Sequence, residues 1–358
     1  MQTHDELGIE FIENIERIAE ILVDGFGLKH SRKVDRTLSS LLRWTDFRLR
    51  FIAPSPRKIF VSDKFPLTLD AETEGALHLI ENKITSGEDV NPFQGKGLML
   101  LHDTSGKSRG ARTDLLWADW GIHHLHLCSA PVDKARYFSE RAPFVLFAIF
   151  GTDHALFVDV RSHKEDFLFA REELISTVAR SWPAYVEAFE LKGTLPPKAS
   201  YSDEERDQLR KAGIEPMLML EGKAYFAPGQ GITSAATSGR VTAEMFRVRK
   251  NLSWLVGLVL DPDGQFLGSL PTAAREQSRF SLSLVVGEGI VLIEQHTGRG
   301  WSLAGAETSG VGGVFAELSN ALAPSWVRDA IAVADNRGDG SQIPLGSSDI
   351  SGIGDASN

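Results

Sequence analysis

A stripe of apolar residues recurs at three- and four-residue steps near the start of the chain: Leu7, Phe11, Ile15, Ile18 and Leu22. Thr3 and Glu6 have the spacing of a capping box, in which each side chain satisfies a backbone N–H at the beginning of a helix. The pattern therefore predicts a long first helix, which Gly25 and Gly27 end. The same reasoning predicts a second, shorter helix around residues 38–44 and a third over residues 71–84.

Alternating patterns indicate strands. Phe47, Leu49 and Phe51 alternate with Arg48 and Arg50, which predicts a half-buried strand. Apolar runs predict further strands over residues 58–62, 97–101, 121–128, 144–150 and 155–160. A short turn joins the last two runs, so we expect them to pair as an antiparallel hairpin, with a helix over residues 170–182 covering one face of the sheet.

Pro196 and Pro197, followed by a polar stretch, favour a domain boundary. Helix and strand patterns alternate beyond it and include a strand over residues 255–260. The prediction is an α+β protein with antiparallel sheets and flanking helices. Its expected parts are an N-terminal domain over residues 1–195, a second α+β domain over 196–335, and a disordered tail over 336–358 that is rich in Gly, Ser and Asp.

The composition is that of a globular protein, with 358 residues, 42% hydrophobic and 24% charged. No apolar run approaches the ~18 residues that span a bilayer, so we expect no membrane partner. Cys128, the single cysteine, excludes an internal disulfide framework and fits a reducing compartment. These features predict a cytoplasmic location.

The net charge of −10 is unevenly distributed. Between Lys29 and Lys58 the chain has nine Lys or Arg residues against two Asp, which we call the basic island. Such a run is either a solvated face or a surface that contacts phosphates, and the second reading makes RNA a candidate partner.

The strongest chemical signal is the stretch Gly121-Ile-His-His-Leu-His-Leu-Cys128. Side chains alternate along a strand, so His124 and His126 share one face and lie ~6.6 Å apart along it. Asp159, Arg161 and His163 share a face of the later strand. If the two strands lie close together, the five side chains form one polar patch.

Such a patch suits the metal-independent cleavage of RNA. One imidazole takes the proton of the 2′-hydroxyl, a second protonates the leaving oxygen, and a guanidinium stabilises the charge on phosphorus. Two alternatives remain open: a divalent metal such as zinc held by His124, His126 and either Asp159 or His163, and a binding or regulatory protein whose histidines are structural.

The polar loop before the histidines carries Lys107, Arg109 and Arg112, which we predict to bind the phosphate backbone of a substrate. A solvated loop is the alternative interpretation. The loop is not a phosphate-binding P-loop, because Leu101 occupies a position where that motif has glycine.

The stretch from Arg112 to Leu127, followed by residues 143–163 and Ser181-Trp-Pro183, resembles a group of uncharacterised bacterial proteins that share an Asp-x-Gly-Ile-His-His-x-His-Leu sequence. The order of sheet and helix between Gly121 and Trp182 is also loosely similar to RelE-type ribonuclease toxins. Neither resemblance assigns an activity, because the second is one of topology only. The patch itself leads us to expect a metal-independent endoribonuclease or phosphodiesterase that needs no cofactor.

Overall fold

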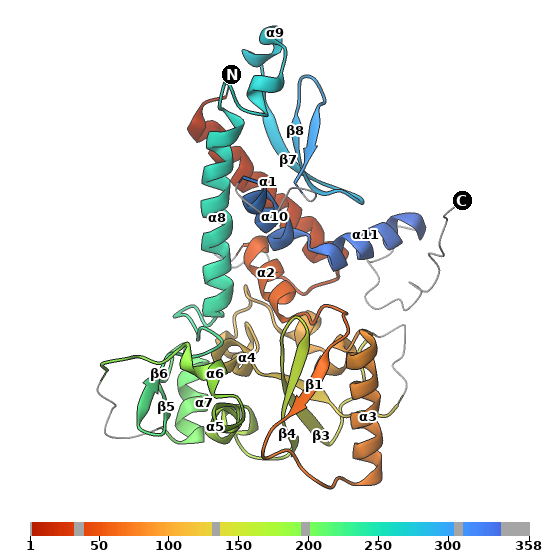
Figure 1. The fold of residues 1–358 in the computed structure, drawn as a ribbon, viewed down its shortest axis with the longest axis vertical. Coiled ribbons are helices and arrows are strands. Elements are labelled where there is room, and N and C mark those ends of the chain that lie inside the picture. The colour runs from red at the N-terminus through yellow and green to blue at the C-terminus, as the bar shows by residue number, and fades with distance from the viewer. Residues whose placement is uncertain (1, 32–38, 131–136, 195–200, 304–310, 338–358) are drawn as a thin grey trace. The chain divides into compact units, whose positions relative to one another are not determined.

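The computed structural model describes the chain except for residues 1, 32–38, 131–136, 195–200, 304–310 and 338–358. It contains antiparallel-rich sheets with flanking helices, which confirms the predicted α+β class (Figure 1). No helix among the described residues is both long enough and apolar enough to cross a membrane. The chain divides into two compact units: unit 1 comprises the described residues of 1–45 and 241–337, and unit 2 comprises the described residues of 46–240.

The sheet of unit 2 has the strand order β1-β4-β3-β2. Its strands are β1 (Lys58–Val61), β2 (His123–His126), β3 (Phe144–Phe150) and β4 (His154–Ser162). The predicted hairpin is confirmed, because β3 and β4 pair antiparallel. β2 also pairs antiparallel with β3, and β1 runs parallel to β4. Since β3 lies between β2 and β4, the two strands that carry the candidate residues are not neighbours.

Helices cover both faces of this sheet. The apolar side of α3 (Ala71–Ser86) packs against one face, where Leu125 and Phe157 are fully buried. α5 (Glu172–Ser181), the predicted covering helix, packs against the other face, which presents Val145 and Phe147. The two helices lie on opposite sides of the sheet in Figure 1.

Shorter elements complete unit 2: η1 (Asn91–Gln94), the π-helical turn η2 (Gly97–Leu101), η3 (Arg109–Ala111), α4 (Leu115–Trp120), η4 (Leu168–Ala170), α6 (Pro183–Glu187), α7 (Asp203–Ala212), β5 (Leu218–Leu220) and β6 (Lys223–Tyr225). β5 and β6 form a small hairpin of their own.

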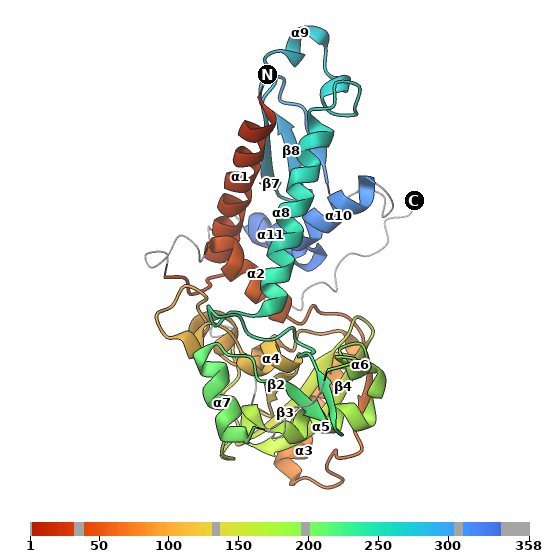
Figure 2. The ribbon, with the colours of Figure 1, turned by 90° about the vertical axis from the view of Figure 1, so that its left-hand side faces the viewer.

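Unit 1 is built on a three-stranded antiparallel sheet with the order β7-β8-β9. Its described elements are α1 (His4–Gly25), the first part of α2 (Ser40–Arg50), α8 (Gly239–Val259), η5 (Leu267–Ser269), α9 (Thr272–Arg275), β7 (Phe280–Val285), β8 (Gly289–Glu294), β9 (Gly300–Ser302), α10 (Val311–Leu322) and α11 (Ser325–Arg337). α1 begins at the predicted capping box of Thr3 and Glu6, and it runs beside β7 (Figure 2).

The division of the chain differs from the boundary predicted at residue 195, which falls inside the span of unit 2. The reason is that the N-terminal segment packs with the C-terminal segment in one unit and forms hydrogen bonds with it. Asn14 Oδ1 accepts a hydrogen bond from the backbone N–H of Leu282 at 2.6 Å, and the buried Trp44 indole donates to the carbonyl of Leu322 at 2.8 Å. α11 extends to Arg337, and the remainder of the predicted tail lies outside the described residues.

Three predicted strands are helical. Residues 47–51 lie in or next to α2, because Phe47 and Phe51 are four residues apart and Asp46 pairs with Arg50 at the same spacing, 2.9 Å apart. The run over 97–101 forms η2, in which Leu98 is buried while Leu100 and Leu101 are exposed. Residues 255–259 continue α8.

Replacing Asn14 tests the pairing of the two segments of unit 1. Asn14→Ala removes the acceptor of the Leu282 amide, so we expect a loss of about 1–3 kcal/mol in the free energy of unfolding and faster hydrogen exchange at Leu282. Asn14→Asp keeps an acceptor oxygen and serves as the control. Unchanged exchange at Leu282 in the alanine variant would contradict the arrangement.

Candidate functional site

The three histidines of β2 occupy two different environments. His123 faces away from the other two and packs edge-on against Phe150, with 5.4 Å between the ring centroids. Its Nε2 lies 3.3 Å from the carbonyl oxygen of Arg50, so that nitrogen carries the proton. Burial lowers the pKa of His123 to about 3. His123 is thus a neutral histidine of the interior.

His124 and His126 share the opposite face, as the strand pattern predicts, and their ring centroids are 6.2 Å apart. His124 is positioned by Asp114, whose Oδ2 lies 3.2 Å from His124 Nδ1. The other carboxylate oxygen, Oδ1, accepts the backbone N–H groups of Leu116 and Trp117 at 3.0 and 3.1 Å and so caps α4. Asp114 therefore joins the beginning of α4 to the histidine strand.

Burial alone would raise the pKa of Asp114, but the adjacent His124 and the charges of Arg50 and His102 outweigh it and hold this pKa well below its usual range. The carboxylate is consequently ionised at neutral pH. It can orient the imidazole of His124 and compensate the charge that this ring acquires with a second proton.

A short connection sets the distance between Asp114 and His124. α4 ends at Gly121, which has a left-handed φ of +73°, and the chain enters β2 two residues later. A Cβ atom at Gly121 would lie 2.7 Å from the Tyr185 hydroxyl, so both the backbone and the space favour glycine here. The hydroxyl of Tyr185 donates to the carbonyl of Trp120 at 3.1 Å and holds the turn.

His126 lies deeper than His124 and stacks on His163. Their rings are nearly parallel, with an interplanar angle of 5° and 5.4 Å between centroids. Burial, followed by the nearby His124, His163 and Arg141, lowers the pKa of His126 to about 3. The pKa of His163 is also lowered, by burial and by Arg141, whose Nη2 lies 3.2 Å from His163 Nδ1. Both rings are therefore neutral at pH 7.

Phe169 bounds the histidine cluster on the apolar side. Its ring centroid is 4.8 Å from that of His124 and 5.6 Å from that of His163. The carbonyl of Phe169 accepts a hydrogen bond from Arg210 at 2.7 Å, and Arg210 also pairs with the buried Asp119 of α4. α4 thus positions both the carboxylate behind His124 and, through Arg210, the backbone of Phe169.

Asp159 and Arg161 do not join these histidines in any direct contact among the described residues. They form a separate ion-pair network, in which Arg161 Nε donates to Asp159 at 2.6 Å and Nη2 donates to Glu173 at 2.7 Å. Glu165 lies 3.5 Å from the remaining nitrogen, Nη1. The guanidinium that was predicted to stabilise phosphorus is therefore engaged by acids of its own neighbourhood.

The predicted phosphate-binding loop is also largely engaged. Arg112 donates to the carbonyls of Gly106 at 2.8 Å and Ala235 at 2.6 Å, and Arg109 donates to the carbonyls of Ala212 and Ser234. These arginines tie the loop to the segment before α8, whereas Lys107 is exposed.

The basic island is not a continuous surface either. Arg43 and Arg50 are buried, with 0% and 2% of their surface exposed, and Arg32, Lys33 and Arg36 lie outside the described residues. Among the described residues, moreover, no three His, Cys, Asp or Glu side chains are grouped so that they could hold a metal ion. The His124, His126 and His163 rings therefore do not form the tridentate site that a zinc hydrolase needs.

Sequence reasoning missed three residues of the cluster: Asp114, Arg141 and Phe169. Asp114 carries a usable signal, since Thr-Asp-Leu-Leu before an apolar run is typical of a helix N-terminus. Its approach to His124, ten positions later, depends on the turn at Gly121. Nothing in the sequence pattern marks Arg141 or Phe169.

The buried histidines should make the protein sensitive to acid. Each is neutral in the fold but protonates near pH 6.5 when unfolded, so stability is complete above that pH and falls toward the folded pKa of about 3. When the pH is lowered from about 7 to about 5, His123 and His126 should each reduce the free energy of unfolding by roughly 2 kcal/mol. In urea unfolding, His123→Gln, which keeps a donor for the Arg50 carbonyl, should lose its share of this pH dependence. An unchanged pH dependence would contradict the burial of a neutral ring.

Comparisons with protein-family models, with curated proteins and with solved structures give no match for this chain. The resemblances to uncharacterised bacterial proteins and to RelE-type toxins therefore stay predictions. The functional proposal therefore rests on the geometry of one cluster, which consists of Asp114, His124, His126, His163 and Arg141.

Proposed function

We propose that unit 2 is a metal-independent phosphodiesterase of the endoribonuclease type, with RNA as its substrate and with His124 and His126 as its acid–base pair. One observation carries the proposal: an ionised, partly buried carboxylate, Asp114, lies 3.2 Å from one of two adjacent imidazoles that share a face of β2. A carboxylate behind one histidine and a second, neutral histidine beside it are the parts that such a reaction uses.

The two imidazoles take different roles because their surroundings differ. His126 is neutral and accepts the proton of the ribose 2′-hydroxyl. As the bond from O2′ to phosphorus forms, the bond from phosphorus to O5′ breaks, and the imidazolium form of His124, whose charge Asp114 compensates, gives its proton to O5′. The products are a 2′,3′-cyclic phosphate and a 5′-hydroxyl. The bound phosphodiester anion raises the pKa of His126 toward the range in which it is an effective base.

Arg141 replaces Arg161 as the candidate that neutralises the phosphate. Its guanidinium is exposed and lies beside His163, which stacks on His126. Arg161, in contrast, is surrounded by Asp159, Glu165 and Glu173. A planar guanidinium that offers two parallel N–H donors is suited to phosphate oxygens.

The alternative with a divalent metal is less well supported, because Asp159 lies a strand away from the histidines and because His124, His126 and His163 are not grouped as metal ligands among the described residues. Asp159 and His124 are each paired with Phe147 of β3, which separates their strands. The proposed reaction needs no metal, and it requires access to RNA, in keeping with the cytoplasmic location that the single cysteine favours.

Cleavage of mixed RNA in the presence of EDTA tests the acid–base pair. His124→Gln should lower the rate by about 10²- to 10⁴-fold, which is the usual contribution of a positioned proton donor. His123→Gln is the matched control, since it removes a neighbouring histidine from the opposite face and should leave the rate unchanged. Equal cleavage by both variants would refute the assignment, and absence of cleavage by the natural protein would favour a binding or regulatory role.

Asp114→Asn tests the carboxylate separately from the fold. Asparagine caps a helix as well as aspartate does, so α4 should persist, but the neutral amide cannot compensate a protonated His124. We expect kcat to fall by roughly 10²- to 10⁴-fold with KM little changed. Unaltered kcat, with circular dichroism showing an intact fold, would remove Asp114 from the mechanism.

A further inference from the structure

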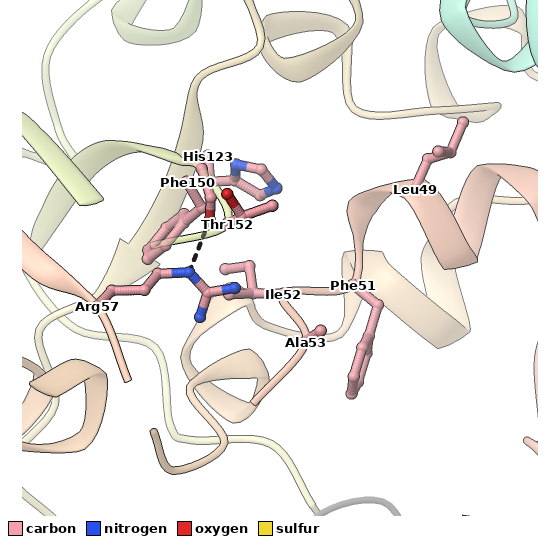
Figure 3. Close-up of a pocket in the computed structure, with 9 residues that line it drawn as sticks. Leu49, Phe51, Ile52, Ala53, Arg57, His123, Phe150 and Thr152 are labelled. Atoms are coloured by element: carbon pink, nitrogen blue, oxygen red, sulfur yellow. Dashed lines mark hydrogen bonds between the residues drawn. The ribbon is translucent and has the colours of Figure 1, made fainter. Parts of the chain in front are cut away.

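A second feature of unit 2 is a pocket on the other face of β2. It has a volume of about 330 Å³ and is lined by Leu49, Phe51, Ile52, Ala53, Arg57, His123, Phe150, Gly151 and Thr152. Its walls are largely apolar, and Figure 3 shows Arg57, Ile52 and Phe150 around the same space. His123 faces this pocket whereas His124 faces the acid–base cluster, so the two sites are distinct.

Among the described residues that line this pocket, Arg57 is the charged one, and two hydrogen bonds fix its side chain. Its Nε donates to the carbonyl of Gly151 at 2.8 Å, and Nη1 donates to the carbonyl of Ser55 at 3.1 Å. The guanidinium carbon lies 5.9 Å from the centre of the Phe150 ring. Nη2 is left to bind a further acceptor, since no described side chain or carbonyl forms a hydrogen bond with it.

No carboxylate among the described residues forms an ion pair with Arg57. The guanidinium is half-buried, and burial lowers the pKa of Arg57 without any opposing influence from a described carboxylate. Removing a cation from water without a counter-charge is unfavourable in free energy, and an anion bound next to the cation offsets part of this penalty. The two hydrogen bonds to carbonyls already order the Arg57 side chain, so a ligand that binds it loses less side-chain entropy.

The part of the wall at Ile52 is fixed by hydrogen bonds as well. The buried Asn91 side chain pairs with both backbone groups of Ile52: its Oδ1 accepts from the N–H, and its Nδ2 donates to the carbonyl, each at 2.8 Å. The pocket is therefore held open by two independent sets of hydrogen bonds, at Arg57 and at Ile52. A preformed cavity of this kind is typical of small-molecule sites.

We propose that this pocket binds a small apolar monocarboxylate, with the carboxylate on Arg57 and the hydrocarbon or aromatic body against Phe150, Ile52 and Ala53. The volume lies at the lower end of the range of about 300–1,000 Å³ for ligand pockets, which suits a single-ring or short-chain acid better than a cofactor. Two of the three Arg57 nitrogens already donate to backbone carbonyls, so the site suits the single charge of a carboxylate better than a phosphate dianion. The site does not depend on the proposed ribonuclease activity.

Calorimetric titration with benzoate, phenylacetate and hexanoate tests the proposal, with phenylacetamide as the uncharged analogue of phenylacetate. At least one of the acids should bind, and phenylacetate should bind at least about tenfold more tightly than phenylacetamide. Arg57→Gln should lose that preference. Lys58→Gln is the matched control, because it removes an exposed cation from the next position and should leave binding unchanged.

A second variant covers the case in which Arg57→Gln fails to fold. Ala53→Leu fills the pocket without altering its charge, and it should abolish binding of every acid. The proposal is overturned if none of the three acids binds at millimolar concentration, if the amide binds as well as the acid, or if Ala53→Leu binds like the natural protein.

Discussion

One carboxylate, Asp114, connects the local structure of unit 2 with its candidate chemistry. One of its oxygens caps α4 and the other faces His124, so a single side chain begins a helix and orients a ring in the next strand. Capping needs only an acceptor oxygen, whereas compensating a protonated His124 needs the ionised form, which the surrounding positive charge maintains against the cost of burial. The turn at Gly121 makes this double contact possible, because it brings β2 back alongside the beginning of α4.

The opposite faces of β2 serve different purposes because burial and charge differ between them. On one face, His124, His126 and His163 form a cluster with Arg141 at its edge, bounded by Phe169. On the other face, the neutral His123 lines an apolar pocket that also contains the positively charged Arg57. A four-residue strand between two covered faces thus separates a site suited to proton transfer from a site suited to ligand binding.

Local signals in the sequence predicted local structure well. The capping box of Thr3 and Glu6, the hairpin of β3 and β4, and the shared face of His124 and His126 all follow from the sequence pattern. The rest depended on long-range contacts. Phe47 and Phe51 fit the periods of both strand and helix, and α1 belongs with β7 although more than 250 residues separate them. Arg161 pairs with Glu165 and Glu173, and their positions beside it are determined only by the fold.

The most direct test of the central claim is an NMR titration of the histidine rings with a 2′-O-methyl dinucleotide, which carries a phosphodiester but cannot be cleaved through O2′. The account predicts that the ring signals of His124 and His126 shift on binding, that the apparent pKa of His126 rises from about 3, and that the signals of His123 stay in place. Unmoved signals for His124 and His126, or an equal response from His123, would contradict a phosphodiester site on this face of β2.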